Sequence, residues 1–264
     1  MNKLIIFLAM ASLWSTVALA GDPEARAIME KVDAVDDGDR RVSDMKMVLI
    51  DKRGKERVRS IRSFAMDQGQ DSRSIIFFLD PADVRGTGFL THDYADPDKD
   101  DDQWLYLPAL KKSKRIAAGD KSGSFMGSDL NYSDMSSRDL DDFDYTMKGE
   151  KEVYGKKVWV IESMPKTPAI AEETGYSKSL LFIYQHNHML VRAINWVEGK
   201  QELKYLDIKR MEKIDGIWTP LEMHVMTKQG KTVLHKTVLT FSNVRYNQDI
   251  DAGLFTLRGL EQGI

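Results

Sequence analysis

The sequence predicts a mainly β protein of the α+β class, built on one long antiparallel sheet. Runs in which apolar and polar residues alternate fill most of the chain after residue 40, and short glycine-containing turns separate the last four runs. A period of two is typical of strands with one wet face, and tight turns between consecutive runs indicate a meander. The 264 residues include no cysteine, so we expect a hydrophobic core, and not disulfides, to hold the fold.

The first 20 residues have the pattern of a secretory signal peptide. Lys3 gives a positive start, residues 4–14 are almost entirely apolar, and Ala18-Leu19-Ala20 matches a cleavage site of small residues. The apolar run is too short to span a bilayer, and no second long one follows. We therefore expect an exported, mature chain of residues 21–264 that forms one domain and does not span the membrane.

One helix is expected near the start of the mature chain, over residues 24–35, because Asp22 can cap it and Pro23 fits its first turn. A second, short helix is predicted over residues 133–144, with Ser133 as its cap. Residues 165–175 are expected to form a loop with one helical turn around residues 169–173. The predicted strands are residues 42–51, 57–66, 74–79, 88–94, 104–110, 157–163, 179–184, 189–198, 202–214, 218–227 and 232–246.

A sheet of about ten or eleven strands must close on itself or be covered, because a flat open sheet would expose an apolar face. The predicted helices are too few to fill its concave side. This leaves room for a ligand cavity, unless large aromatic side chains fill the space instead.

The charge pattern excludes some partners. The net charge of −3 gives no general attraction to nucleic acid. Residues 111–115 (KKSKR) are a basic exception. They are interpreted as a solvated strand end, or alternatively as a docking patch for an acidic partner or phospholipid headgroups.

A search for catalytic and metal-binding patterns gives little. The segment 123–127 has glycines spaced as in a nucleophile elbow, but Phe125 stands where the serine should be. His186 and His188 flank one residue with no carboxylate nearby in sequence, which favours a turn over a metal site. The acidic stretch 96–102 lacks the glycine and glutamate of an EF-hand loop, so a solvated loop is the preferred interpretation. We expect no enzymatic activity, no metal and no cofactor.

The apolar side chains on strands and beside the flexible loop 121–129 are more suggestive. Phe125 and Met126 lie among glycine and serine, where a core anchor would be unusual, so the loop could be a mobile gate, a structural plug or a docking loop. Strand alternation separates Trp104 and Tyr106 from Leu105 and Leu107, and both sets are apolar enough for burial. The predicted residues of an apolar ligand site and its gate are Phe89, Trp104, Tyr106, Leu107, Leu110, Phe125, Met126, Trp159, Trp196, Trp218 and Met223.

Three motifs carry a resemblance to a known family. Residues 85–90 (RGTGFL), 101–110 (DDQWLYLPAL) and 124–129 (SFMGSD) resemble the signature of the outer-membrane lipoprotein-sorting proteins, relatives of the periplasmic carrier LolA and its receptor LolB. The resemblance implies a single incomplete antiparallel β-barrel with a helical lid over an apolar cavity. It covers nearly the whole mature chain, although the motifs belong to a branch distinct from LolA itself, and the lack of cysteine separates the chain from lipid-anchored receptors.

The function implied by this resemblance is a periplasmic carrier or chaperone that binds a lipid or a lipoprotein acyl chain. Because family members are often linked to RND-type exporters, an RND-type inner-membrane exporter is the expected protein partner. The alternative is a non-transporting accessory protein that docks on such an exporter or another envelope partner through its surface.

Overall fold

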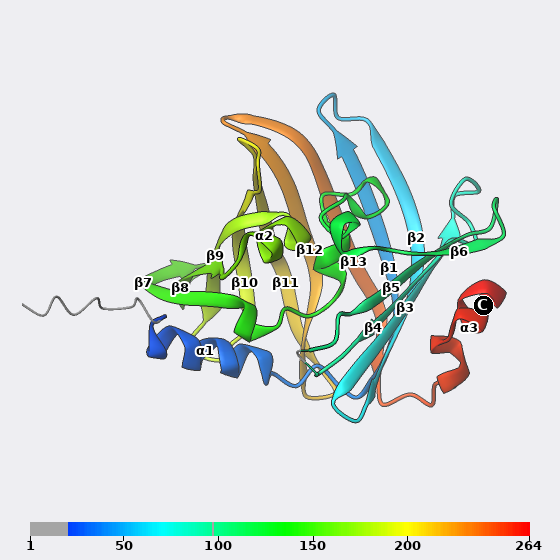
Figure 1. Cartoon of the computed structure of the whole chain (residues 1–264), viewed down its shortest axis with the longest axis horizontal. Coiled ribbons are helices and arrows are strands. Elements are labelled where there is room, and N and C mark those ends of the chain that lie inside the picture. Colours follow the sequence, from blue (N-terminus) through cyan, green and yellow to red (C-terminus); the bar gives the residue numbers. More distant parts are fainter. Residues whose placement is uncertain (1–20, 97) are drawn as a thin grey trace, which may run out of the picture.

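The computed structural model describes residues 21–96 and 98–264, and the predicted signal peptide lies outside them. Its framework is one antiparallel sheet of thirteen strands in the order β6-β5-β4-β3-β2-β1-β13-β12-β11-β10-β9-β8-β7 (Figure 1). The first and last strands of the chain, β1 and β13, pair in the middle, and every other neighbour in the sheet is also a neighbour in sequence. The prediction of a mainly β, antiparallel fold is confirmed.

The elements have the following bounds. The strands are β1 (Arg40–Asp51), β2 (Glu56–Gln68), β3 (Asp71–Asp80), β4 (Gly88–Asp93), β5 (Asp102–Leu107), β6 (Lys112–Arg115), β7 (Phe143–Val153), β8 (Lys156–Pro165), β9 (Tyr176–Tyr184), β10 (Leu190–Val197), β11 (Leu203–Ile214), β12 (Ile217–Gln229) and β13 (Thr232–Tyr246). The helices are α1 (Pro23–Asp33), α2 (Pro168–Thr174) and α3 (Leu257–Gln262).

The predicted first helix is confirmed as α1. The carboxylate of Asp22 accepts hydrogen bonds from the backbone N–H groups of Glu24, at 2.9 Å, and Ala25, at 3.4 Å. These bonds satisfy donors that the first turn of a helix leaves without a partner. The buried side of α1, which includes Ile28 and Met29, packs against the sheet near β7.

Two predictions about the elements need correction. The strand count was too low, because β6 and β7 were missed; both are edge strands with mostly exposed, charged side chains and little apolar alternation. Residues 133–144 do not form the predicted α-helix. They contain two short 3-10 turns, Tyr132–Met135 and Leu140–Asp142, and then enter β7. The helical turn expected within the loop 165–175 is confirmed as the short helix α2, which Thr167 caps and Gly175 ends with φ of 77°.

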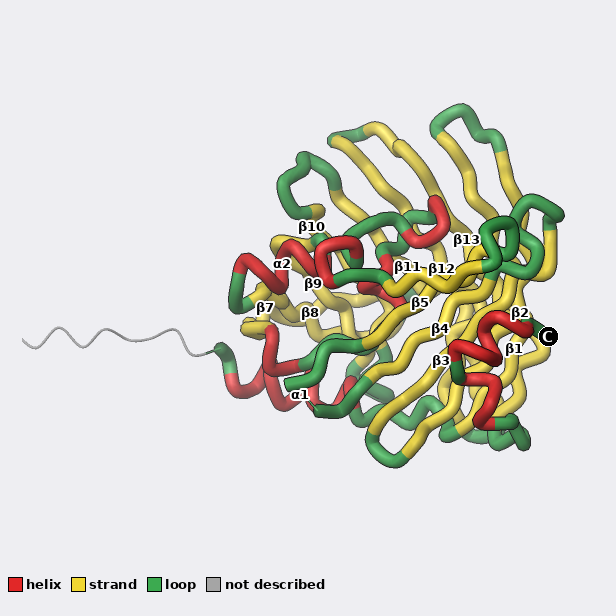
Figure 2. The backbone as a smooth tube through the Cα atoms, turned by 45° about the vertical axis from the view of Figure 1, so that its right-hand side comes forward, coloured by secondary structure: helices red, strands yellow, loops and turns green. Residues whose placement is uncertain are grey.

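The two faces of the sheet carry separate apolar clusters. The inner face includes Met47 of β1, Phe89 of β4 and Leu239 of β13. The outer face of the β2–β5 region includes Phe77 and Leu90, against which the C-terminal segment with α3 packs. Figures 1 and 2 show α2 and the turns between β6 and β7 within the bend of the sheet, and α3 outside it. The inner face is therefore the covered, concave one.

Candidate functional site

A segment between β6 and β7, residues 121–132, lies on the inner face, and we call it the plug segment. Its backbone is held largely by bonds within itself: Phe125 N donates to Leu130 O at 2.7 Å and Tyr132 N to Gly123 O at 3.0 Å. A turn at Met126 and Gly127, with φ of 50° and 73°, reverses the chain between them. Because these bonds do not involve the sheet, the segment is a preformed loop laid onto the strands.

The apolar tip of the plug segment enters the core of the inner face. Phe125 has 0% exposure, and its ring centroid lies 5.1 Å from Phe89, 5.6 Å from Tyr132 and 6.3 Å from Phe78. The edge-to-face geometry with Phe89 and Tyr132 is one that aromatic pairs favour. Leu130 is also buried in this cluster, while Met126 is half-buried at its border. Phe125 and Leu130 thus occupy, in this structure, space in which the sequence allowed either a ligand cavity or a filling of large aromatic side chains.

Polar side chains fasten the plug segment to two neighbouring strands, β12 and β13. The Asp129 carboxylate, with 1% side-chain exposure, accepts from Thr227 Oγ1 at 2.5 Å and Thr237 Oγ1 at 2.7 Å. It also lies 2.7 Å from His235 Nδ1. Thr237 Oγ1 in turn accepts from the backbone N–H of Asp129 at 2.9 Å. A buried carboxylate is costly unless it is hydrogen-bonded, and here three side chains of the sheet supply that compensation.

Two buried basic residues also contact the plug segment. Lys204 Nζ donates to Asn131 Oδ1 at 2.5 Å, and burial lowers the pKa of this lysine. Arg59, 8% exposed, donates to the carbonyl oxygen of Met126 at 2.6 Å, and burial likewise lowers its pKa. Neither cation has a carboxylate within ion-pair distance among the residues that the structure describes. The plug segment supplies only neutral acceptors to them directly.

The structure brings some of the predicted ligand-site residues together and separates others. Those that join the inner-face cluster with the plug segment are Phe89, Leu107, Phe125, Met126 and Met223. Trp159 packs beside α1 and stacks on His188, with centroids 5.6 Å apart. The others lie away from these clusters: Leu110 is 63% exposed at the end of β5, while Trp196 and Trp218 are half-buried beneath Lys178 and Lys213.

The question of which side chains of β5 face inward is settled by their neighbours. Leu105 and Leu107 belong to the inner-face cluster, whereas Trp104 and Tyr106 pack on the outer face with the C-terminal segment. His92 lies between that segment and Trp104, 2.8 Å from the carbonyl oxygen of Phe255. The two aromatic residues therefore do not share a face with Phe89 and Phe125.

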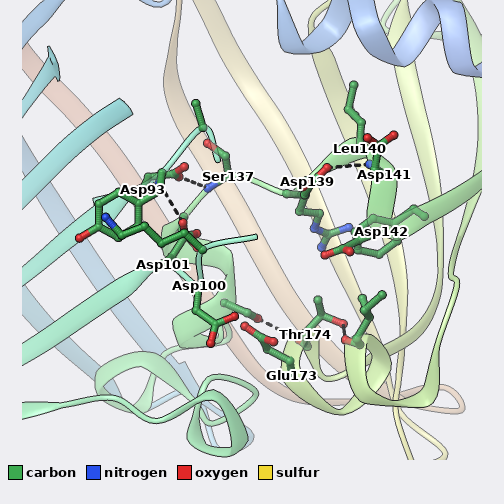
Figure 3. A pocket seen from close by; sticks show the side chains of 18 of the residues that line it. Asp93, Asp100, Asp101, Ser137, Asp139, Leu140, Asp141, Asp142, Glu173 and Thr174 are labelled. Carbon is green, nitrogen blue, oxygen red and sulfur yellow. Dashed lines mark hydrogen bonds between the residues drawn. The ribbon is translucent and has the colours of Figure 1, made fainter. Parts of the chain in front are cut away.

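An open cavity of about 530 Å³ lies beside the plug segment and is lined mainly by charged and polar residues (Figure 3). Burial and neighbouring carboxylates raise the pKa values of Asp33, Asp101 and Asp142 in its wall. Its cations are partly engaged, since Lys121 pairs with Glu173 at 2.5 Å. Its acidic lining residues are Asp33, Asp93, Asp96, Asp100, Asp101, Asp139, Asp141, Asp142 and Glu173.

The histidine pair singled out in the sequence lies in a turn. Residues 185–189 connect β9 to β10, and the His186 and His188 rings face different partners, Trp218 and Trp159. Across the described ranges, 21–96 and 98–264, no group of three or more histidine or acidic side chains could hold a metal ion.

The residues that fasten the plug segment were missed from sequence. Asp129 lies 98 positions before Thr227 and 106 before His235, and only the fold brings these residues together. The available signal was that Lys204, Thr227 and His235 occupy inward positions that are otherwise apolar along their strands. This signal can be recognised only when the pairing of the strands is known.

Comparison with known proteins identifies the family of this chain. A family model described as an uncharacterized protein matches residues 70–262. The crystal structure of a DUF1329 family protein from Desulfovibrio piger is 32% identical, with 90% of this chain and 98% of that chain covered and a TM-score of 0.81. This chain belongs to the DUF1329 family. No curated protein matches it.

Two further structures relate this DUF1329 protein to lipoprotein-sorting proteins. A putative outer membrane lipoprotein-sorting protein domain from Vibrio parahaemolyticus is 27% identical, with 90% and 98% coverage and a TM-score of 0.81. A LolA superfamily protein from Nitrosomonas europaea, at 17% identity, covers 89% of this chain and 98% of its own with a TM-score of 0.67, which shows a common fold. The family resemblance inferred from the three motifs is confirmed. None of the helices in the described ranges is long and apolar enough to cross a bilayer.

Proposed function

We propose that this DUF1329 protein is a periplasmic carrier that holds the acyl chain of a lipid or lipoprotein on the inner face of its sheet. The observation that carries the proposal is the plug segment, a loop with its own backbone hydrogen bonds whose apolar side chains fill the inner face. Such a loop can leave the sheet without breaking a strand pairing. It would then expose the apolar surface on which an acyl chain can lie.

The energies of the exchange favour a long acyl chain over the apolar tip of the plug segment. Removing an acyl chain from water is worth about 0.8 kcal/mol per methylene, so a 16-carbon chain gains roughly 12 kcal/mol before the costs of binding. Burial of one phenylalanine or leucine side chain is worth about 1.5–3 kcal/mol, so Phe125 and Leu130 together contribute less than such a chain. A long chain can therefore replace the tip of the plug segment, whereas a short one gains too little.

The comparisons support the carrier over an enzyme. The Vibrio relative is described as a putative lipoprotein-sorting protein, and the fold is that of the LolA superfamily. The inner face offers apolar side chains and hydrogen-bond donors to a cargo, as a carrier requires. In this proposal the incomplete barrel of the family corresponds to the bent sheet, the lid to α1, α2 and the plug segment, and cargo transfer proceeds between the membranes of the envelope.

A second candidate, an accessory protein that docks on an RND-type exporter or another envelope partner, is favoured by a different observation. The turn after β5 and the start of the edge strand β6 expose Leu110, at 63%, beside Lys111 and Lys112. An exposed leucine next to cations suits an acidic partner surface. This surface lies on the sheet edge, so docking there and cargo binding on the inner face are compatible.

Locking the plug segment tests the carrier proposal. Asp129 N lies 2.9 Å from Thr237 Oγ1, so Asp129→Cys with Thr237→Cys places two thiols within bonding reach in a chain with no other cysteine. The oxidised variant should fail to bind the neutral fluorophore N-phenylnaphthylamine or to take up lipid from vesicles, and reduction should restore both. The control Val48→Cys with Val58→Cys joins opposed residues of β1 and β2 and should bind in both redox states.

Equal uptake by the oxidised and reduced plug lock would refute the proposed route into the inner face. Mass spectrometry of organic extracts from natively purified protein supplies the complementary measurement. A carrier should yield lipid in stoichiometric amounts, whereas a purely docking protein should yield none.

A further inference from the structure

The inner face carries a line of polar residues across four adjacent strands, next to its apolar cluster. Strand register places His235 of β13 opposite Thr227 of β12, and Thr227 opposite Lys204 of β11. Lys204 is in turn opposite Asn195 of β10. We call this line the polar row; its members are His235, Thr227, Lys204 and Asn195. Thr237 lies two residues beyond His235 on the same face of β13.

A polar row in this position is unexpected on stability grounds. Thr227, Lys204 and Asn195 are buried, at 9%, 9% and 6% exposure. Burying hydroxyl, ammonium and amide groups costs free energy that apolar residues at the same inward positions would not cost. The row therefore needs partners.

Most of those partners come from the plug segment, through a carboxylate and an amide oxygen. Asp129 accepts from Thr227 and Thr237 and faces His235 Nδ1, and Asn131 accepts from Lys204. The sheet thus surrounds one negatively charged group with two hydroxyls and an imidazole, with an ammonium next to them. Opposite charges near Lys204 include Asp129 and Asp134, both of which belong to the covering segments and not to the sheet.

Two atoms of the polar row have no partner at all within the described part of the chain. Asn195 Oδ1 and His235 Nε2 are both buried and form no hydrogen bond. Such orphaned polar atoms are rare in folded proteins and each calls for an explanation. They lie at the two ends of the row, so the plug segment satisfies its centre and leaves its ends unfilled.

We propose that the polar row is the binding site for an anionic headgroup, a carboxylate or phosphate, and that Asp129 occupies it as an internal substitute until cargo displaces the plug segment. This inference rests on the proposed carrier function and specifies the chemical class of the cargo as an acidic lipid. The acyl chain takes the place of Phe125 in the apolar cluster. The headgroup oxygens take the place of the Asp129 carboxylate and accept from the hydroxyls, the imidazole and Lys204. A headgroup larger than a carboxylate also reaches the orphaned ends of the row.

The test compares an anionic and a neutral ligand that share one acyl chain. Hexadecanoate and its methyl ester share one chain, and each is titrated at neutral pH against full-length mature protein preloaded with N-phenylnaphthylamine. The wild-type protein should bind the acid about tenfold more tightly than the ester, because hydrogen bonds to a charged acceptor are about twice as strong as neutral ones. Asp129→Asn weakens the internal competitor and should tighten binding of both ligands, because both must displace the plug segment, while the acid keeps its preference.

Lys204→Gln should reduce the preference for the acid to within about threefold, since the amide donates without a charge. Its matched control is Lys228→Gln, which removes the same charge from the neighbouring position on β12, where the lysine lies over the Tyr205 ring. This control should keep the wild-type preference. Dihexadecyl phosphate and phosphatidylglycerol vesicles, run beside the fatty acid, distinguish a phosphate headgroup from a free carboxylate.

The outcomes separate this inference from the function on which it rests. Equal binding of acid and ester by wild type and by Asp129→Asn would overturn the headgroup site and leave the carrier function intact. Failure of every ligand to displace the fluorophore would overturn both. If Asp129→Asn does not fold, the acid-to-ester ratio of the wild-type protein and of Lys204→Gln still decides.

Discussion

Replacing Phe125 with alanine measures whether the plug segment is a separate cooperative unit. A fully buried phenylalanine changed to alanine typically costs about 3–5 kcal/mol of folding free energy. Phe125 meets that condition, with 0% exposure and three aromatic neighbours. That cost falls on the whole protein only if the plug segment unfolds together with the sheet.

If the plug segment can leave the sheet by itself, Phe125→Ala mainly lowers the free energy of this local opening and not the free energy of global unfolding. A loss of 3 kcal/mol corresponds to an increase of more than about a hundredfold in the equilibrium constant for opening, since 1.4 kcal/mol is tenfold. We expect Phe125→Ala to accelerate exchange of the Phe125-region amides, such as the N–H of Tyr132, by at least that factor. Exchange in the strands should change little, and binding of N-phenylnaphthylamine should rise.

The matched control is Phe77→Ala. Phe77 is 2% exposed in β3 and belongs to the outer-face cluster, so its loss should lower the unfolding free energy by the full amount in urea denaturation. In this control, hydrogen exchange of the plug-segment amides should not accelerate more than exchange of the strand amides. If Phe125→Ala instead lowers the unfolding free energy as much as Phe77→Ala, with plug and strand amides accelerating together, the plug segment is an inseparable part of the core and the reasoning fails.

Two further predictions concern regions outside the inner face. Burial and the neighbouring Asp93 raise the pKa of Asp101, so the ionised form destabilises the fold above that pKa, and the penalty disappears as the pH falls through it. Asp101→Asn should therefore raise the melting temperature at pH 7, by about 2–4 °C for each kcal/mol of destabilisation removed. This gain should shrink in acid and in high salt, and an equal gain at every pH would contradict the electrostatic cause. A Cβ at Gly259 would lie 2.3 Å from the carbonyl oxygen of Leu254, so Gly259→Ala should release α3 from the outer face, detected as faster proteolysis of the C-terminus with unchanged fluorophore binding; an undisturbed C-terminus would show that the segment tolerates the shift.

Much of the fold could be predicted because its signals are local. The turns at Gly199, Gly216 and Gly230 join consecutive strands, and all three have the positive φ that favours glycine. Asp22 and Pro23 start a helix wherever the following residues permit one. The edge strands β6 and β7 escaped because an edge strand buries few side chains, and residues 143–153 lose apolar alternation after Met147.

The candidate site was predicted less well, because its contacts are long-range. The serine and glycine residues around Phe125 suggested an exposed tip, but the partners that bury it, Phe78 and Phe89, belong to β3 and β4. Trp104 and Tyr106 have the composition of a cavity wall, yet the register directs them to the face that α3 covers. Sequence alternation separates two faces of a strand without saying which one is concave.

The strand order leaves the sheet open along one line, which we call the seam. Within the described chain, β6 and β7 are the two ends of the sheet and have no backbone pairing with each other. A closed cylinder can widen only by breaking a ladder of hydrogen bonds or shifting its register, whereas a sheet with a seam can change its curvature by small rotations between many neighbouring strands. Both borders carry charge, with Lys112 and Lys114 on β6 and alternating lysine and glutamate on β7, which discourages other strands from adding there. The sheet can therefore change its curvature while every strand keeps its partners.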